Sequence, residues 1–178
     1  MRLPALFSLA LATLLSLAAS AAHAEPQIEN FVERVTSLNF FHIQSSEIAA
    51  KRAMRAETKD FAQEILAWHQ DAQQDLAEAA REDGLAVPAI IDTEQREKLT
   101  ALSQAPAPDF DAVYMSAQIS AYAASGRLYQ DLIKNGQPSR LKTFAEHTYP
   151  ELHMLEVRTQ AQSSPGPVTD GEASRLKR

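Results

Sequence analysis

The sequence has 178 residues, of which 45% are hydrophobic and 22% are charged, and its formal net charge is −6. The length indicates one domain, and the five Gly and scarce strand-forming runs argue against a β-sandwich or barrel. Because the chain has no Cys, it excludes disulfides, iron–sulfur clusters, thiolate zinc sites and a cysteine nucleophile. The negative charge argues against a nucleic-acid partner. No Gly-rich phosphate loop or Gly-x-Ser-x-Gly elbow is present.

The beginning of the chain has the pattern of a secretory signal peptide. A positive charge at Arg2 precedes a long apolar stretch, and small residues stand at Ala22 and Ala24, the positions that signal peptidase reads. We expect a cleaved signal peptide, residues 1–24, and a mature chain, residues 25–178, in the periplasm or at the periphery of the envelope. The alternative is an uncleaved membrane anchor. No transmembrane segment is expected after cleavage, because no later stretch is apolar enough to span a bilayer.

Residues 27–54 and 57–83 predict two long helices joined by a short turn. Inward positions recur at spacings of three and four residues, which is typical of a helix with one face buried in a bundle. Gly84 provides a stop after the second helix. Because the turn is short, we expect the two helices to be antiparallel neighbours. The inward positions are Ile28, Phe31, Val35, Leu38, His42, Ser45 and Ala49 in the first helix, and Phe61, Ile65, Trp68, Ala72, Leu76 and Ala79 in the second.

A long link, residues 84–109, separates this helix pair from the next. Within the link, Asp92 and Gln95 resemble a capping box for a short helix that ends near Ser103. The link is long enough to run the length of the helices. The expected fold is therefore all-α, a ferritin-like four-helix bundle with one long crossover link that contains a short helix. The alternative is an up-down-up-down arrangement in which the link stays over one end.

The second helix pair follows the link. A third helix is predicted from about Asp109 to just before Gly136. A fourth is predicted from Pro138, because Pro is favoured in the first turn of a helix. Pro150 lies within this fourth helix and is expected to kink it.

The last residues differ in composition from the helices. They are rich in Pro, Gly and Ser and end in the basic residues Arg175, Lys177 and Arg178, so we expect a disordered tail over residues 163–178. Three charges on such a tail are weak evidence for binding to anionic envelope polymers. The helical bundle domain is therefore predicted over residues 25–162.

If the link is a full crossover, four side chains are expected near the middle of the bundle. His42 and His69 lie 14 and 13 residues from the middle of the first turn, and Tyr122 and His153 lie 15 and 16 residues from the middle of the second. At 1.5 Å per residue these separations are all about 20 Å or slightly more. Bundle proteins hold metals and cofactors at this height. The four residues are therefore candidate ligands for zinc, copper or iron. The alternative for the two histidines is a hydrogen-bonded residue in the core or at its boundary.

The sequence argues against the di-iron chemistry of ferritins. Di-iron bundles carry a Glu-x-x-His pair on each of two helices, and this sequence contains no such pair. Glu64 and His69 are five residues apart, which puts them on different faces of a helix. His147 is expected to face solvent. We predict no catalytic residues and no resident cofactor, and the sequence does not indicate an enzyme.

Several stretches resemble an exported bacterial family that is called domain of unknown function 4142. The resemblance runs in order and spacing from about residue 28 to residue 158, and it implies a ferritin-like helical fold without an established activity. The matching stretches are LNFFHIQSS at 38–46, DFAQ at 60–63 with His69, FDAVYM at 110–115, FA at 144–145 and TYPEL at 148–152.

The chain departs from the family pattern at the candidate ligands. The family commonly has Glu where this chain has His42, and His where this chain has Tyr122. The family's frequent His in the last helix falls at Leu155, with His153 nearby, and only His69 keeps the usual residue. If the family pattern binds a metal, the resemblance implies that this chain has lost or rebuilt the site.

Two functions from different classes remain. The first is a non-catalytic helical module of the bacterial envelope that binds an envelope protein or associates with itself. The second is a ferritin-like metal-binding protein with His42 and His69 as ligands, helped by Tyr122 or Glu64. The second function requires the imidazoles to converge, whereas the first predicts an apolar patch outside the core.

Overall fold

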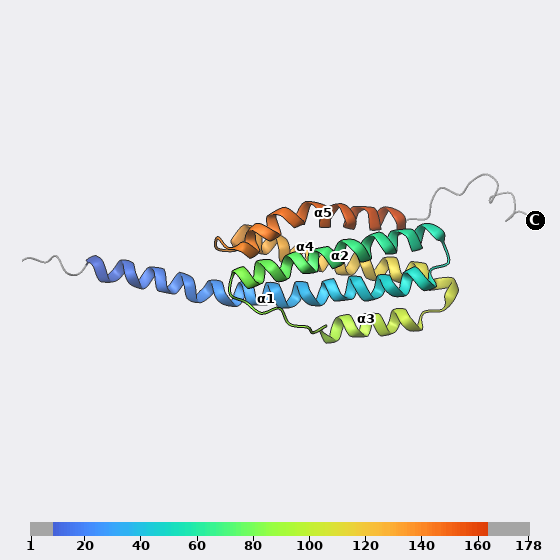
Figure 1. Cartoon of the computed structure of the whole chain (residues 1–178), viewed down its shortest axis with the longest axis horizontal. Coiled ribbons are helices and arrows are strands. Elements are labelled where there is room, and N and C mark those ends of the chain that lie inside the picture. The colour runs from blue at the N-terminus through green and yellow to red at the C-terminus, as the bar shows by residue number, and fades with distance from the viewer. Residues whose placement is uncertain (1–8, 164–178) are drawn as a thin grey trace, which may run out of the picture.

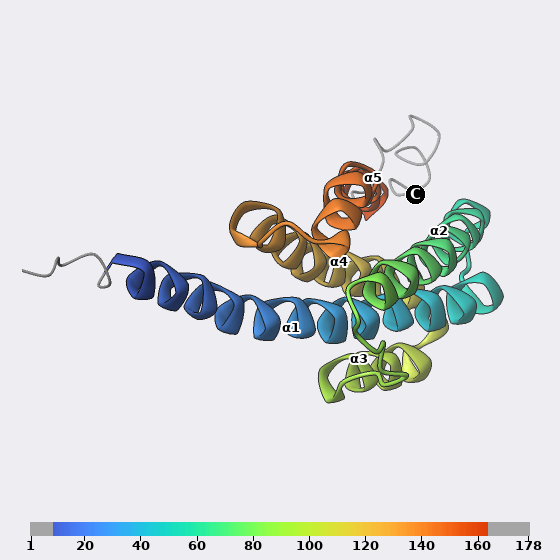
Figure 2. The same ribbon diagram turned by 60° about the vertical axis from the view of Figure 1, so that its left-hand side comes forward.

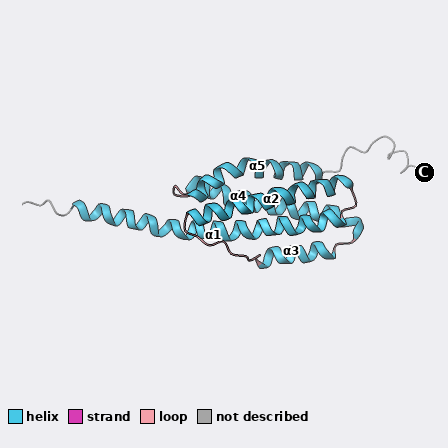
Figure 3. Cartoon of the chain, in the orientation of Figure 1, coloured by secondary structure: helices cyan, strands magenta, loops and turns pink. Residues whose placement is uncertain are grey.

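The computed structural model describes residues 9–163, with side chains from residue 27 onward. Every regular element in this range is a helix, and the range contains no strand (Figure 3), so the all-α prediction is confirmed. No helix within it is long and apolar enough to cross a membrane. The elements are α1 (Leu9–Arg52), α2 (Ala56–Glu82), α3 (Thr93–Gln104), the short 3-10 helix η1 (Ala107–Asp109), α4 (Phe110–Asn135) and α5 (Arg140–Ser163).

The first helix begins earlier than predicted. The predicted start was Gln27, but α1 begins at Leu9 and continues through Pro26. The added segment is rich in Ala and Leu, which are strong helix formers. It extends beyond the other helices in both views (Figures 1 and 2). Signal-peptide cleavage stays a prediction, and the first eight residues lie outside the described range.

The last helix begins two residues later than predicted. Pro138 precedes α5 instead of occupying its first turn, because Ser139 acts as the cap: its Oγ accepts the N–H of Lys142 at 3.0 Å. Pro150 lies inside α5 as predicted, and a kink there stays a prediction. Ser163 is the last residue of α5, and residues 164–178 of the predicted tail lie outside the described range.

Four long helices pack around a common core. Each of α1 and α5 packs against both α2 and α4, while α3 lies on the outside against α1 and α4 (Figure 2). Burial of aromatic and aliphatic side chains drives this association. The largest side chains sealed in the core include Tyr114, Tyr122, Tyr129, Phe41 and Phe110.

Two aspartates show which helix ends meet. Asp111, in the first turn of α4, accepts the N–H groups of Met54 and Arg55 at the start of α2, at 2.8 and 3.0 Å. At the opposite end, Asp83 accepts two N–H groups in the first turn of α5. Helices α2 and α4 therefore begin at the same end and run parallel. The link between them runs the length of the helices (Figure 1), which contradicts the alternative in which it stays over one end.

The start of α3 is capped as the sequence suggested, but only in part. Asp92 Oδ1 accepts the N–H of Gln95 at 2.9 Å. The reciprocal half of a capping box is missing, because the N–H of Asp92 donates instead to Ser37 Oγ of α1 at 2.9 Å. This bond attaches the beginning of α3 to the outside of α1.

Arg52 clamps the end of α3 to α1. Its guanidinium donates to the carbonyl oxygens of Leu102, Ser103 and Ala105 at 3.2, 2.5 and 2.7 Å. The guanidinium carbon also lies 4.7 Å from the centroid of the Phe110 ring. The last carbonyls of a helix have no partner within the helix, so one cation satisfies this end of α3 and holds the link in place.

Candidate functional site

Three of the four predicted ligand residues meet in the core. His42 of α1, His69 of α2 and Tyr122 of α4 are all 0% exposed. The two imidazole centroids lie 4.0 Å apart with the ring planes 8° from parallel, and the Tyr122 ring centroid lies 4.4 Å from that of His42. Residues from three helices therefore form one stacked aromatic cluster.

His153 does not join this cluster, although the sequence analysis placed it with the other three residues. Its side chain is 55% exposed, its Nδ1 lies 3.2 Å from Glu156 Oε2, and its ring stacks on Tyr149. His153 follows the buried Leu152, and one step along a helix turns the side chain by about 100°. The His153 side chain therefore lies on a different face of α5 from the buried Leu152.

Hydrogen bonds engage both ring nitrogens of His69. Its Nδ1 lies 3.0 Å from Asn39 Oδ1, and Asn39 Nδ2 donates to Gln73 Oε1 at 3.0 Å. Because an amide oxygen only accepts, this arrangement assigns the proton of His69 to Nδ1. The Tyr122 hydroxyl, 3.2 Å from Nε2, then donates to that nitrogen. His69 is therefore a neutral imidazole without a free nitrogen.

A second chain of hydrogen bonds holds His42. Its Nδ1 donates to Gln118 Oε1 at 2.5 Å, Gln118 Nε2 donates to Ser45 Oγ at 2.8 Å, and Ser45 Oγ donates to the Phe41 carbonyl at 2.6 Å. The same tautomer leaves Nε2 of His42 unprotonated. This nitrogen is buried and has no hydrogen-bond partner among the described residues.

Burial keeps the cluster uncharged. Desolvation lowers the pKa of His42 from its ordinary 6.5 to about 4; the Gln118 hydrogen bond opposes this shift and Lys98 adds to it. Burial is the main cause that holds the pKa of His69 well below its usual range, and the neighbouring His42 lowers it further. Burial also raises the pKa of the Tyr122 hydroxyl well above its usual range. A charge on any of these groups would lose hydration without gaining a counter-charge.

The stacked rings do not suit a metal ion shared by the two histidines. A metal lies in the plane of each coordinating imidazole, about 2.0–2.1 Å from the nitrogen. Rings stacked with nearly parallel planes direct their lone pairs side by side instead of toward one point. The predicted helper Glu64 is engaged elsewhere, by Arg158 at 2.7 Å. Within residues 27–163, no group of three or more His, Asp or Glu is placed to hold a metal.

The sequence analysis missed the amides that organise the cluster. Asn39 precedes His42 by three residues, and Gln118 precedes Tyr122 by four, so each pair shares a helix face. Both amides are buried, with 3% and 0% exposed. A search for polar residues at inward spacings could have found them. The whole cluster is closed to solvent.

His147 lies at the surface, as predicted. It lines a shallow cleft of about 270 Å³ between α2 and α5, together with Trp68, Asp71 and Glu151. Trp68 Nε1 donates to Glu151 Oε2 at 2.9 Å. The predicted inward Trp68 is therefore a boundary residue, with its indole nitrogen bound across the cleft.

These features define an all-helical domain in which His42 and His69 belong to a buried polar cluster. Residues 14–162 match the family described as Domain of unknown function (DUF4142). The match covers more than half of the chain, and the chain belongs to this family. The match begins inside the predicted signal peptide. No curated protein and no solved structure matches the chain.

Proposed function

We propose that the protein is exported and acts in the bacterial envelope as a non-catalytic helical module that binds another envelope protein or a second copy of itself. This proposal rests on a contrast in exposure between two groups of side chains. His42 and His69 are sealed in the core, whereas Met154 and Val157 on α5 are 55% and 51% exposed. These two side chains are three residues apart and share one helix face. Neighbouring exposed apolar side chains suit contact with a partner.

The helix order supports a ferritin-like four-helix bundle as the scaffold of this module. Helices α2 and α4 run parallel because the link between them runs the length of the helices. One long crossover is the arrangement of ferritin-like bundles. Since no Glu-x-x-His pair is present, we do not extend the proposal to di-iron chemistry.

Charge substitutions on α5 test the binding role. The variant Met154→Glu/Val157→Glu is compared with His147→Glu/Ala161→Glu, which places two carboxylates at other exposed positions of α5. Chemical cross-linking in the native host and sedimentation of the purified protein report partner adducts and self-association. We expect the first variant to lose the adduct or the oligomer and the second to keep it, with equal thermal midpoints. Retention in both variants, or no association of the wild type, would overturn the proposal.

Export is tested separately. We expect the protein recovered from the periplasm to begin at Glu25 when its intact mass is measured. A periplasmic species that keeps residues 1–24 would support the uncleaved anchor instead, and recovery from the cytoplasm alone would refute the envelope location.

A second candidate, a metal-binding bundle, is favoured by one observation: Nε2 of His42 is a buried nitrogen without a partner. Binding would require the stacked rings of His42 and His69 to rotate apart. The test is the zinc, copper and iron content of the mature chain, purified without chelator or His tag, beside a His42→Ala/His69→Ala variant. Stoichiometric metal that the variant loses would support this candidate. A metal-free wild type would exclude it.

A further inference from the structure

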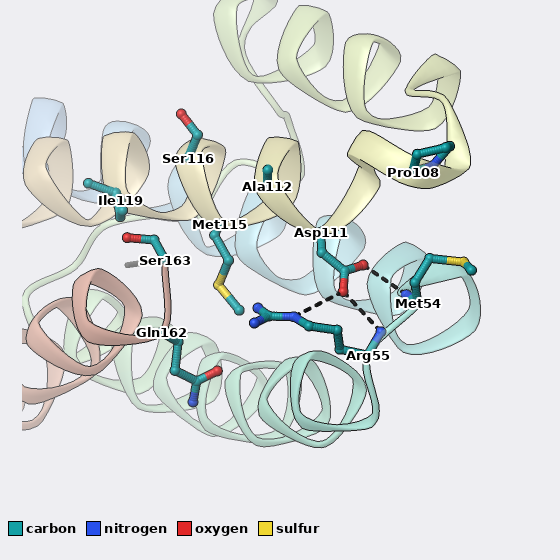
Figure 4. Close-up of a pocket in the computed structure, with 10 residues that line it drawn as sticks. All are labelled: Met54, Arg55, Pro108, Asp111, Ala112, Met115, Ser116, Ile119, Gln162 and Ser163. Atoms are coloured by element: carbon teal, nitrogen blue, oxygen red, sulfur yellow. Dashed lines mark hydrogen bonds and ion pairs between the residues drawn. The ribbon is translucent and has the colours of Figure 1, made fainter. Parts of the chain in front are cut away.

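A cleft of about 590 Å³ opens at the end of the molecule where α5 stops (Figure 4). Ser163, the last residue of α5, stands on one side of the cleft near Ile119 of α4, and Met54 and Pro108 stand on the other. Ile119 is eight residues from Asp111, so α4 continues for about 12 Å past the end of α5. The cleft therefore occupies the space that further turns of α5 would fill.

The floor and far wall of the cleft combine apolar surface with one available cation. Met115 forms the floor, and Met54 is 67% exposed, which is unusual for a large apolar side chain. The Arg55 side chain is 53% exposed, and its Nε lies 3.4 Å from Asp111. Among the described residues, the other guanidinium nitrogens of Arg55 have no ion-pair partner. An occupant with apolar residues followed by a carboxylate would complement this surface.

We propose that this cleft is the docking site of the chain's own C-terminal segment, residues 164–170, which reads SPGPVTD. The segment leaves α5 at Ser163, on the rim of the cleft. Two Pro with Gly166 between them strongly disfavour a helix, so we do not expect the segment to continue α5. The cleft is thus filled by the same chain in an extended conformation.

The length and order of the segment fit the cleft. A Pro-rich chain advances about 3.1 Å per residue, so four residues cover the roughly 12 Å from Ile119 to the level of Asp111. Val168, the next residue, then lies beside Met54 and covers it. Asp170 follows within a Thr-Asp-Gly sequence that favours a turn, which brings its carboxylate to Arg55. A second copy or another protein would leave this match of reach and charge unexplained.

Engineered cysteines test the docking, because the chain has no Cys of its own. The full-length protein carries Met54→Cys with Val168→Cys. The control carries Asp60→Cys with Val168→Cys. Arg158 of α5 meets Glu64 of antiparallel α2, so Asp60 is near the height of Ser163 but does not line the cleft. The control thiol is therefore also within reach of the segment.

Under mild oxidation at low protein concentration, we expect the first pair to form an intramolecular disulfide at least tenfold faster than the control pair. Equal rates would overturn the proposal. Disulfides between chains that increase with concentration would overturn it in favour of a second copy. Peptide masses without reduction distinguish these outcomes.

Alkylation provides a second measurement that needs no disulfide. Truncation after Ser163 should raise the alkylation rate of a Met54→Cys thiol several-fold and leave that of an Asp60→Cys thiol unchanged. No change at position 54 would show that the segment does not cover the cleft. Unchanged thermal midpoints confirm that the variants are folded.

Discussion

Protonation of His42 couples the stability of the protein to pH. The folded pKa of about 4 lies below the ordinary value of 6.5. Between these values the unfolded chain binds a proton that the folded chain does not. The free energy of unfolding is therefore highest above the unfolded pKa and falls as the pH decreases toward 4, by up to about 3 kcal/mol for this group. His69, whose pKa is also lowered, adds to the same fall.

The variant His42→Gln should show a shallower fall in unfolding free energy between about pH 7 and pH 4 than the wild type. It should also lose stability at neutral pH, because Gln118 loses its imidazole partner and a cavity is left. Urea unfolding at several pH values measures both effects. The exposed His147→Gln is the control and should keep the wild-type slope. A wild-type slope in His42→Gln would contradict the role of His42.

The number of residues between a side chain and the nearest turn predicted its height along the bundle better than the direction in which it points. Helical rise alone brought His42, His69 and Tyr122 to one level. The direction of a side chain also depends on which neighbours surround its helix. Tyr122 is buried because α4 contacts α1, α3 and α5, whereas His153 lies on an outer face of α5. The stacking of the imidazoles could not be predicted, because it depends on rotamers and on the amides of Asn39 and Gln118.

At the scale of elements, we expect Arg52 to hold α3 against α1 through the planar shape of its guanidinium and not through charge alone. Arg52→Lys keeps the charge but cannot contact the three carbonyls and the Phe110 ring together. We expect a loss of about 1–3 kcal/mol in stability and faster amide hydrogen exchange in α3. Lys51→Ala, at the exposed neighbouring position, should change neither. Wild-type exchange in the α3 of Arg52→Lys would show that other contacts hold this helix.

Asp111 joins two elements by capping α2 from α4. Burial alone would raise the pKa of this carboxyl, but the hydrogen bonds that it accepts, led by those from the N–H groups of Met54 and Arg55, together hold the pKa below its usual value. Its stabilising contribution is thus present above the unfolded pKa and is lost as the pH falls through the lower folded pKa.

Asp111→Ala should therefore cost about 1–2 kcal/mol at neutral pH, and the difference from the wild type should shrink in acid. Thermal unfolding at neutral and acidic pH measures both values. Asp60→Ala, on the exposed side of the first turns of α2, is the matched control and should have a small effect. A pH-independent loss would point to packing instead of capping.

The ends of helices were predicted correctly where residues adjacent in sequence determine them. The Asp92 cap and the end of α4 before Gly136 were predicted from adjacent residues. The start of α5 was misplaced because Ser139 competes with Pro138, and the reverse cap from Asp83 comes from a residue far away in sequence. The clamp by Arg52 was likewise not visible, since it depends on where the link returns.

For the whole molecule, the projecting start of α1 is expected to contribute little to stability. It extends beyond the other helices (Figures 1 and 2), so it lacks the tertiary packing that supplies most helical stability. A chain of residues 25–178 should unfold with the same thermal midpoint as residues 1–178, measured in detergent if the longer form aggregates. A large decrease would show that the early part of α1 packs on the body of the protein.

The buried polar layer also limits how the helices can slide along one another. The middle of α4, from Gln118 to Gly126, buries mostly small or polar side chains, which alone would discriminate weakly between axial positions. A shift of α4 by one turn, about 5.4 Å, would separate Gln118 from His42 and Tyr122 from His69. Each buried group left without a partner costs about 1–3 kcal/mol. The histidines therefore select a single register for α4, so that the fold is specified by hydrogen bonds where apolar packing leaves it ambiguous.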